Sequence, residues 1–582
     1  MTTSLRCKLR ATGALAIVSL FSALSHAQGP ITLSPSVPSP APLGTLVTWT
    51  AQAPGPAVFR FRVHEIGKDP RMAVDFGREN TFEWAPYEHE GQYLIEASAR
   101  NEITGAISTI EVPFEVLSNA SAGVPSIKET SHPLVFLYSA PPCSAGAMTF
   151  VTFTDPEGHA QKTPEKRCDE LHSVNFLLAG LRPETMYVAR HTLTDGDRSL
   201  SGPGIPFTSG GLPESISKHT AAGTTGSPSQ GVLLAGSLNT NFVATDMSGT
   251  PIWYYPKTMQ FLTHPETGGV FFGINQDRTG GEIRQIVRLF DLTGVTIIET
   301  NAARINEQLE EMGHSRIGSF HHEARFLSNG NILVLASVER ILEDVQGDGR
   351  VNVLGDALVV LDRDLKVTWY WDAFDHLDPK REAVLGSPCN AAACPPLYLA
   401  PEANDWTHAN SVAETPDGNL LISVRHQDWV VKVDYAKGLG SGAVLWRLGR
   451  GGDFQIEDGA DDDWFSHQHD AEFESDGTLT LFDNGNTRRA SDDTVQSRGQ
   501  AMILDETRHT VKWLLNANLG VYSVAVGSAQ LLDNGNYFFD CGFLADATAI
   551  SIEVNPLGVP VHSLRSSAPE YRTFRMKNMY TP

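Results

Sequence analysis

A short pattern of turns and tryptophans recurs from about residue 231 to the end of this 582-residue chain. In its fuller copies a polar motif leads into a strand, a turn and a second strand, and a tryptophan-containing strand ends the unit. Asn-Gly and Asp-Gly pairs between β-rich runs are the strongest short-range signal for a β-hairpin. The turns are Asn329-Gly330, Asp417-Gly418, Asp476-Gly477 and Asn534-Gly535, and the tryptophans are Trp253, Trp369, Trp446 and Trp513.

The number and length of the copies predict the fold of this region. Six copies with a period of roughly 40–60 residues and about four strands each are typical of a six-bladed β-propeller, which we expect over residues 231–582. A linear β-solenoid is the alternative, but its repeats are shorter and hold fewer strands per period. The copies run over about 231–258, 268–300, 321–373, 407–449, 468–516 and 522–565.

Two smaller β-domains are expected before the repeats, so that the fold class is all-β. Residues 28–120 alternate apolar and polar side chains, which is typical of an Ig-like antiparallel β-sandwich. Residues 127–212 form a second β-domain, in which the segment 178–187 resembles the corner before a late strand of fibronectin type III domains. Stretches rich in Gly, Ser and Thr at 118–126 and 210–230 are interpreted as linkers.

The first 27 residues have the features of a signal peptide. Three basic residues between positions 6 and 10 precede an apolar run over 11–24, and small residues at 25 and 27 predict cleavage after Ala27. The apolar run is too short to span a bilayer comfortably, so a membrane anchor is the weaker interpretation. We therefore expect an exported protein, periplasmic or secreted, that does not associate with a membrane.

Five of the six cysteines lie beyond this leader, and an oxidising compartment permits them to form disulfides. The expected pairs are Cys143–Cys168 and Cys389–Cys394, with Cys541 left unpaired and buried on a strand. Free buried thiols are the alternative, because spacing does not prove connectivity.

The formal net charge of −24 excludes nucleic acid as a partner, because phosphate binding requires a basic surface. An anionic substrate must therefore meet a locally basic pocket. Exposed edges of the N-terminal β-sandwich are able to pair with a second copy, so a homodimer is an option that nothing in the sequence requires.

Histidines open three of the repeats. In a propeller the first strand of each blade lines the central channel, so residues just before those strands converge at one mouth of it. Arg425 follows the next strand of the fourth repeat and is expected to point to the same place. The three openings are His321-His322-Glu323, His408-Ala409-Asn410 and His467-Gln468-His469.

Three interpretations of these histidines compete. A structural or solvated role is common for one histidine but improbable for three at equivalent repeat positions. Three imidazoles also suit zinc. Arg425 is always protonated, opposes a cation and favours an anion. The third interpretation, a repeat that simply tolerates histidine at a polar rim, would not explain Arg425 or Asn410. We therefore expect an anion site with no metal and no cofactor.

These repeat openings belong to a larger set of motifs. The set comprises His321-His322-Glu323, His408-Ala409-Asn410-Ser411, Ser423-Val424-Arg425-His426-Gln427, Gln468-His469-Asp470-Ala471, Leu481-Phe482-Asp483-Asn484-Gly485-Asn486, Gly527-Ser528-Ala529-Gln530-Leu531-Leu532 and Tyr571-Arg572-Thr573-Phe574-Arg575 with Tyr580. Together they resemble the bacterial aryl-sulfate sulfotransferases over roughly 231–582. No glycine-rich phosphate loop opens a helix, so a nucleotide-dependent sulfotransferase is not suggested.

The resemblance implies a periplasmic six-bladed propeller that transfers a sulfuryl group from an aryl sulfate to a phenol in ping-pong fashion. It implies that His469 is the nucleophile and becomes sulfated, with His322, His408 and Arg425 as further catalytic residues. Asn410 and His321 are assigned to substrate binding. Two β-domains before the repeats depart from the single β-sandwich of the family members considered.

Two other functions remain open from the sequence. An aryl sulfate hydrolase would pass the sulfuryl group of the same histidine to water. A non-enzymatic ligand-binding propeller is the other alternative, and the intact set of His322, His408, Arg425 and His469 argues against it.

Overall fold

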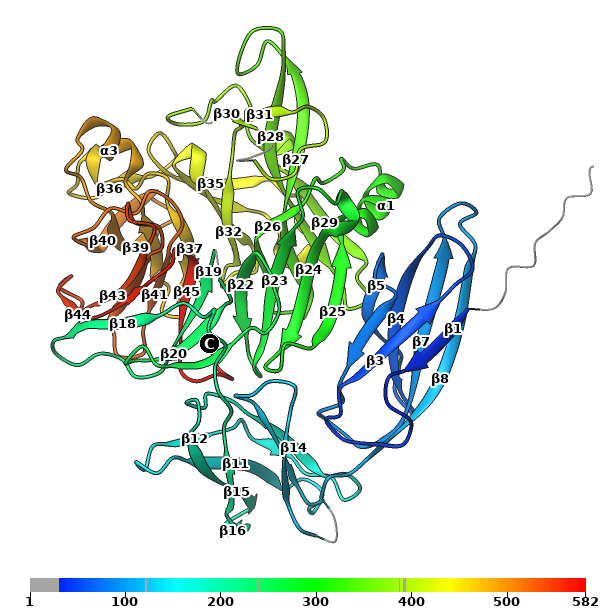
Figure 1. Cartoon of the computed structure of the whole chain (residues 1–582). Helices are drawn as coiled ribbons and strands as arrows, with labels where there is room; N and C mark the ends of the chain where they lie inside the picture. The colour runs from blue at the N-terminus through cyan, green and yellow to red at the C-terminus, as the bar shows by residue number, and fades with distance from the viewer. Residues whose placement is uncertain (1–30, 121–122, 239, 387, 391–393) are drawn as a thin grey trace, which may run out of the picture.

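The computed structural model describes residues 31–582 except 121–122, 239, 387 and 391–393 (Figure 1). The predicted signal peptide therefore lies outside the described residues. Strands dominate, which confirms the all-β class, and the described residues include three short α-helices. None of the described helices has the length and apolar character needed to cross a membrane. The helices are α1 (Ala302–Met312), α2 (Ala373–His376) and α3 (Asn486–Ser491).

The first β-unit packs two sheets around an aromatic core. Trp49 and Phe114 meet edge to face across it, with ring centroids 5.6 Å apart. Alternate residues of β3 are buried, as expected for a strand with one face on a core. One sheet holds β1 (Thr32–Pro35), β3 (Val47–Gln52) and β6 (Thr81–Trp84); the other holds β2 (Ala41–Pro42), β4 (Ala57–Glu65), β5 (Arg71–Gly77), β7 (Gly91–Asn101) and β8 (Ile107–Leu117).

The second β-unit also consists of two sheets. The Tyr187 hydroxyl accepts a hydrogen bond from the Arg182 amide at 3.0 Å and closes a corner within the segment 178–187. One sheet holds β9 (Ser126–Glu129), β10 (Phe136–Ala140) and β14 (Val174–Leu178). The other holds β11 (Met148–Thr154), β12 (Ala160–Lys162), β13 (Lys166–Arg167), β15 (Met186–Asp195), β16 (Arg198–Ser201) and β17 (Ile205–Thr208).

Six runs of four antiparallel strands follow in the described part of the chain. The first three are β45 (Glu570–Met576) with β19 (Val232–Ser237), β20 (Val243–Asp246) and β21 (Pro251–Tyr254); β22 (Phe261–Glu266) to β23 (Val270–Gln276), β24 (Gln285–Asp291) and β25 (Thr296–Asn301); and β26 (Phe320–Phe326) to β27 (Ile332–Glu343), β28 (Arg350–Leu361) and β29 (Val367–Asp372).

The remaining three runs continue in chain order. They are β32 (Ala409–Glu414) to β33 (Leu420–Val424), β34 (Trp429–Val433) and β35 (Val444–Gly449); β37 (His469–Phe473) to β38 (Leu479–Asp483), β39 (Arg498–Asp505) and β40 (Thr510–Asn518); and β41 (Ser528–Leu531) to β42 (Tyr537–Cys541), β43 (Ala549–Val554) and β44 (Pro560–Ser566).

The first strands of successive runs contact one another, and the series returns to its start. Strand β22 contacts β19 and β26, β32 contacts β26 and β37, and β41 contacts β37 and β45. Strand β45 then pairs with β19, from Val232 opposite Met576 to Ser237 opposite Glu570. The first repeat therefore takes its fourth strand from the C-terminus, a long-range pairing that no local sequence pattern reveals.

Two further segments depart from the sequence expectation. The stretch 210–230, interpreted as a linker, contains β18 (His219–Thr224), which pairs with β44 at the outer edge of the last run. After the third run, β30 (Pro388–Asn390) and β31 (Glu402–Asp405) form a small extension, in which β31 pairs in parallel with β28. This extension and the long β27–β28 hairpin project together in Figure 1.

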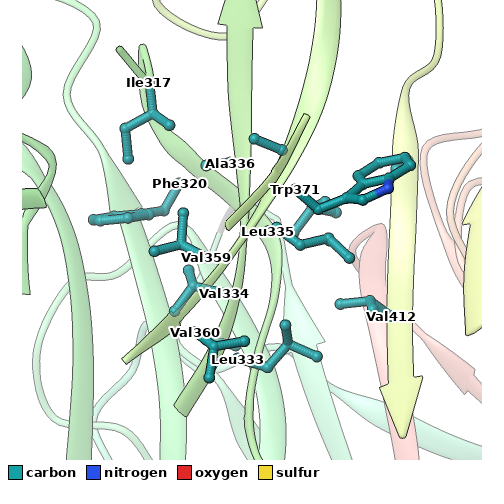
Figure 2. Close-up of a cluster of buried hydrophobic side chains, with 14 of the residues drawn as sticks. Ile317, Phe320, Leu333, Val334, Leu335, Ala336, Val359, Val360, Trp371 and Val412 are labelled. Carbon is teal, nitrogen blue, oxygen red and sulfur yellow. The ribbon is translucent and has the colours of Figure 1, made fainter. Parts of the chain in front are cut away.

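The core of the third run explains why its strands are apolar without alternation. The first eight residues of β27 are all buried. Figure 2 shows Leu333 and Leu335 of this strand with Trp371 of β29 and Val412 of the neighbouring run. Both faces of the sheet are therefore covered by adjacent sheets, so both faces carry apolar side chains.

The predicted disulfides are confirmed. Cys143 is bonded to Cys168 within the second β-unit, and Cys389 to Cys394 in the extension that precedes the fourth run. Cys541 is free and buried on β42, also as predicted.

A buried histidine joins the second β-unit to the first repeat. Nδ1 of His132 accepts the Leu134 amide at 3.0 Å, so Nε2 carries the proton and donates to the Tyr254 carbonyl at 2.8 Å. Burial lowers the pKa of His132 to about 4, while its hydrogen bonds oppose the shift.

We therefore expect acid to weaken this junction. The unfolded chain protonates His132 near its ordinary pKa of about 6.5, but the folded chain protonates it only near 4. The neutral ring therefore contributes fully to the free energy of unfolding above pH 6.5, and this contribution disappears as the pH falls towards 4. It amounts to about 3 kcal/mol. As the pH is lowered from 6.5 to 4, the midpoint temperature of thermal unfolding should fall less steeply in His132→Gln than in the native protein or in His64→Gln. An equal slope in all three would refute the assignment.

Candidate functional site

Irregularities in three first strands turn the predicted histidines towards one another. The pairing register shifts between Phe320 and Ala324 in β26, between Ala409 and Ser411 in β32, and between His469 and Glu472 in β37. Such bulges redirect side chains and are common beside functional sites.

The backbone is unusual at the same places. His322, His408 and His467 have φ of 58°, 47° and 53°, a left-handed conformation that is uncommon outside glycine. Such strain persists only where the surrounding structure holds it in place. The loop backbones at the starts of three runs are thus fixed to present histidines.

The imidazole rings form a continuous series. The ring centroids of His322 and His408 are 5.2 Å apart, those of His408 and His426 4.5 Å, and those of His426 and His467 5.7 Å. The structure therefore brings together His322 and His408 from different repeats, as the repeat symmetry predicts. His426 and His467 were not singled out as site residues; their signal was their position beside Arg425 and His469.

His469 has a defined tautomer. Asn484 donates through Nδ2 to the carbonyls of Ser523 and Val526, at 2.9 and 3.1 Å, so its Oδ1 must face His469. Nδ1 of His469 lies 2.7 Å from that oxygen and therefore carries the proton. Nε2 therefore carries the lone pair, which accepts a hydrogen bond from the Val526 amide at 3.2 Å.

Burial keeps two of these imidazoles neutral. It is the main cause that holds the pKa of His469 well below its usual value, followed by the nearby positive charge of Arg425. Burial likewise lowers the pKa of His322, with His321 and His408 adding to the effect. A neutral imidazole has a free lone pair, so His469 has the electronic state of a nucleophile.

Asp405 orients two neighbouring histidines. Its carboxylate accepts from Nδ1 of His408 at 2.5 Å, and its carbonyl accepts from Nδ1 of His426 at 2.7 Å. Burial alone would raise the pKa of Asp405, but His408, His426 and Arg425 hold it well below its usual range. Nε2 of His408 is therefore the nitrogen left for a substrate, and an ionised carboxylate lies behind the ring.

Arg425 begins a 3-10 turn, Arg425–Gln427, directly after β33. One of its terminal nitrogens bonds to Nε2 of His426, and the other donates to the Val524 carbonyl at 3.4 Å. Its Nε is buried without a hydrogen-bond partner among the described residues. The guanidinium thus adds a fixed positive charge with an unused donor to the histidine series.

Asp405, His408 and His426 also satisfy the spacing of a metal site, with ligand atoms within 4.8 Å of one another. The hydrogen bonds to Asp405 place a proton on Nδ1 of both histidines, which removes those lone pairs from coordination. Arg425 adds a positive charge beside them. The donor set therefore fits an anion better than a cation.

The two residues predicted to bind substrate lie close behind the ring series. His321 is 2% exposed, with Nδ1 2.7 Å from Nδ1 of His322 and Nε2 3.0 Å from Asp356. Asn410 is fully buried and donates to the Gln468 carbonyl at 2.7 Å. In this arrangement both residues support their neighbours rather than face an open surface.

The C-terminal strand β45 supplies the floor of the site. The Tyr571 hydroxyl lies 3.2 Å from the carbonyl oxygens of both His322 and Asn410, which share its one proton. Arg572 donates to the Asn410 carbonyl at 2.8 Å and to Glu323 at 2.7 Å. The sequence motif at 571–575 marked this segment but did not disclose its role.

The chain matches a known family over most of its repeats. The family model described as Arylsulfotransferase (ASST) matches residues 216–567, more than half of the chain. Arylsulfate sulfotransferase AssT of Escherichia coli O6:H1 is 27% identical over 241 residues, which are 33% of this chain and 39% of that protein. The Lelliottia amnigena protein of the same name is 26% identical over 213 residues, 29% of this chain and 34% of the relative. The matched segments thus span little more than a third of these relatives.

Solved structures resemble the chain only weakly. A protein of unknown function from Bacteroides caccae has 12% identity and a TM-score of 0.36, and covers 59% of this chain and 98% of its own. A two-domain fibronectin type III segment of chicken tenascin has 14% identity and a TM-score of 0.14, and covers 31% of this chain and 97% of its own.

The tautomer of His469 is directly measurable. Histidine-selective ¹⁵N NMR should show this ring neutral, with its proton on Nδ1, well below pH 6.5, because burial lowers its pKa. Asn484→Asp places a carboxylate charge beside Nδ1 of His469 and should raise that pKa, whereas Asn518→Asp, on the surface end of β40, should leave it unchanged. An imidazolium signal from native His469 at pH 6.5 would contradict the geometry.

Proposed function

The chain belongs to the arylsulfotransferase family, and on that premise we propose that it transfers a sulfuryl group from an aryl sulfate ester to a phenolic acceptor. The group is carried in between on Nε2 of His469. The observation that carries the proposal is this neutral imidazole, whose lone pair lies on Nε2 beside the charge of Arg425.

We propose that residues 231–582 form a six-bladed β-propeller with the site at one mouth of its channel. Support comes from the six antiparallel runs and from the contacts among their first strands, which close on themselves through β45 and β19. The units at 28–120 and 127–212 are proposed as Ig-like and fibronectin III-like domains.

Export to the periplasm or medium is part of the same proposal. It rests on the leader with cleavage after Ala27 and on the two disulfides, which an oxidising compartment preserves. The proposed partners are small aryl sulfates and phenols.

In the first step the Nε2 lone pair of His469 forms a bond to sulfur as the bond from sulfur to the aryl oxygen breaks. The leaving phenolate takes that electron pair, and Nδ1 keeps its proton against Asn484. The Val526 amide must release Nε2 and is then placed to donate to a sulfuryl oxygen. A covalent intermediate divides the transfer into two easier reactions.

Proton transfer is assigned to His408. Its Nδ1 is held by Asp405, which stabilises the ring when it is doubly protonated, as the carboxylate does in a catalytic triad. Protonated His408 gives the Nε2 proton to the departing phenolate and takes one from the acceptor phenol in the second step. The lowered pKa of His322 suits it to a neutral hydrogen-bonding role instead.

In the second step the acceptor oxygen attacks sulfur, the bond from Nε2 to sulfur breaks, and its electron pair returns to His469. Throughout, negative charge on the sulfuryl oxygens lies beside the Arg425 guanidinium. The two half-reactions give ping-pong kinetics.

The intermediate provides the decisive experiment. Brief exposure to a nitrophenyl sulfate without acceptor should add one SO₃ group to the peptide that contains His469, and later addition of a phenol should remove it and yield the new aryl sulfate. His469→Asn should show neither. Turnover without this label would disprove the proposed intermediate, and loss of the label to water despite added phenol would identify a hydrolase.

The role of Arg425 gives a second test. Loss of one donor aimed at transition-state charge costs about 3 kcal/mol, so Arg425→Ala should slow the first half-reaction about a hundredfold. Rapid measurement of phenolate release in a single turnover reports that step. Arg508→Ala removes an equal charge from the exposed β39–β40 turn and should have no effect. Equal rates in both variants would exclude Arg425 from the reaction.

A further inference from the structure

Away from this site, three metal-binding side chains meet where the first two β-units touch. His89 lies between β6 and β7, and Asp169 and His172 lie between β13 and β14. One potential ligand atom from each lies within 4.8 Å of the other two. We propose that these residues bind a divalent transition metal ion, of which Zn²⁺ fits best, and that the ion links the two units.

The backbone that carries His89 is held firmly. The Tyr93 hydroxyl donates to the His89 carbonyl at 2.7 Å. From the other unit, Asn175 donates to the carbonyl of the preceding residue, Glu88, at 3.0 Å. The loop position is therefore fixed relative to both units, and only the imidazole remains to be placed.

The opposite side is equally well ordered. Oδ1 of Asp169 accepts the amides of Leu171 and His172, both at 2.7 Å, in a tight turn. The carbonyl of Asp169 accepts the Cys143 amide at 3.3 Å, and the Cys143–Cys168 disulfide is directly adjacent. A site whose ligands lie on such supported backbone is largely preorganised.

The imidazole of His89 has an unused nitrogen. Its Nδ1 is buried and has no hydrogen-bond partner among the described residues. A buried polar atom without a partner is unfavourable, and a metal ion would satisfy it. The His89 and His172 rings are 5.5 Å apart between centroids.

Asp169 is ready to act as an anionic ligand. Its Oδ2 lies 3.0 Å from Nδ1 of His172. Asp169 therefore supplies the anionic ligand through Oδ2.

Two imidazoles and a carboxylate form a ligand set that zinc uses, with water in the fourth position. Ligand atoms on tetrahedral zinc lie about 3.3 Å apart, so the three atoms must draw together. The side chains of Asp169 and His172 are 49% and 36% exposed, and binding of the ion replaces the hydrogen bond between them.

A third cluster in the described residues is a weaker candidate. Asp155, Glu157 and His159 also lie within ligand distance of one another. They contain one imidazole and belong to a single loop, the segment between β11 and β12. Neither Asp155 nor Glu157 nor His159 would link two units.

Metal titration of the full chain tests the proposal. After dialysis against a chelator, Co²⁺ should add visible d–d absorption of a tetrahedral site, and Zn²⁺ should displace it at one equivalent. His89→Asn and His172→Asn should each lose this absorption and bind one equivalent less than the native protein. The matched control, His64→Asn on β4 of the same unit, should retain both.

Hydrogen exchange separates a ligand role from misfolding. Zn²⁺ should slow amide hydrogen exchange at residues 86–90 and 168–173 in the native protein and in His64→Asn. It should leave exchange unchanged in His89→Asn, whose circular dichroism spectrum must first be shown to match that of the native protein. Equal metal stoichiometry in native protein and His89→Asn would overturn the proposal, as would Zn²⁺-induced protection only around 155–159 or 405–426.

Discussion

The pairing of β45 with β19 is the interaction on which the rest of the repeat region depends. It connects residues 570–576 to residues 232–237, more than three hundred positions apart, and makes β45 the fourth strand of the first run. The same strand delivers Tyr571 and Arg572 beneath the first strands of the third and fourth runs. Closure of the sheets and support of the site are therefore one structural event.

Buried polar residues in the site are arranged so that each fixes the protonation of the next. Backbone carbonyls fix the Asn484 amide, Asn484 fixes the tautomer of His469, and Asp405 does the same for His408 and His426. Partly satisfied networks of this kind would be costly in a low-dielectric interior. Arg425 is only partly satisfied: its terminal nitrogens bond to His426 and Val524, while its buried Nε has no partner among the described residues.

The two N-terminal units are attached to the repeats by specific contacts. Strand β5 of the first unit lies beside β25 of the second run, where Val74 pairs with Glu299. The second unit contacts the first repeat through His132. It also contacts the C-terminal segment, because the Tyr580 hydroxyl donates a hydrogen bond to the Leu177 carbonyl. These contacts hold the units on the side of the repeats, and the proposed zinc ligands lie between the units themselves.

Much of this organisation was determined by local sequence. Turn dipeptides and tryptophans gave the repeats, cysteine positions gave both disulfides, and repeat symmetry indicated that His322 and His408 would meet. Local patterns suffice there because turn geometry, loop closure and repeat register each depend on neighbouring residues.

Tertiary structure alone decided that β45 completes the first run, that β18 is a strand rather than a linker, and that His321 and Asn410 lie behind the rings. It also decided which nitrogen of His469 is free. Those outcomes depend on partners hundreds of residues away and on which carbonyl or amide a buried side chain meets, and neither is encoded in any window of sequence.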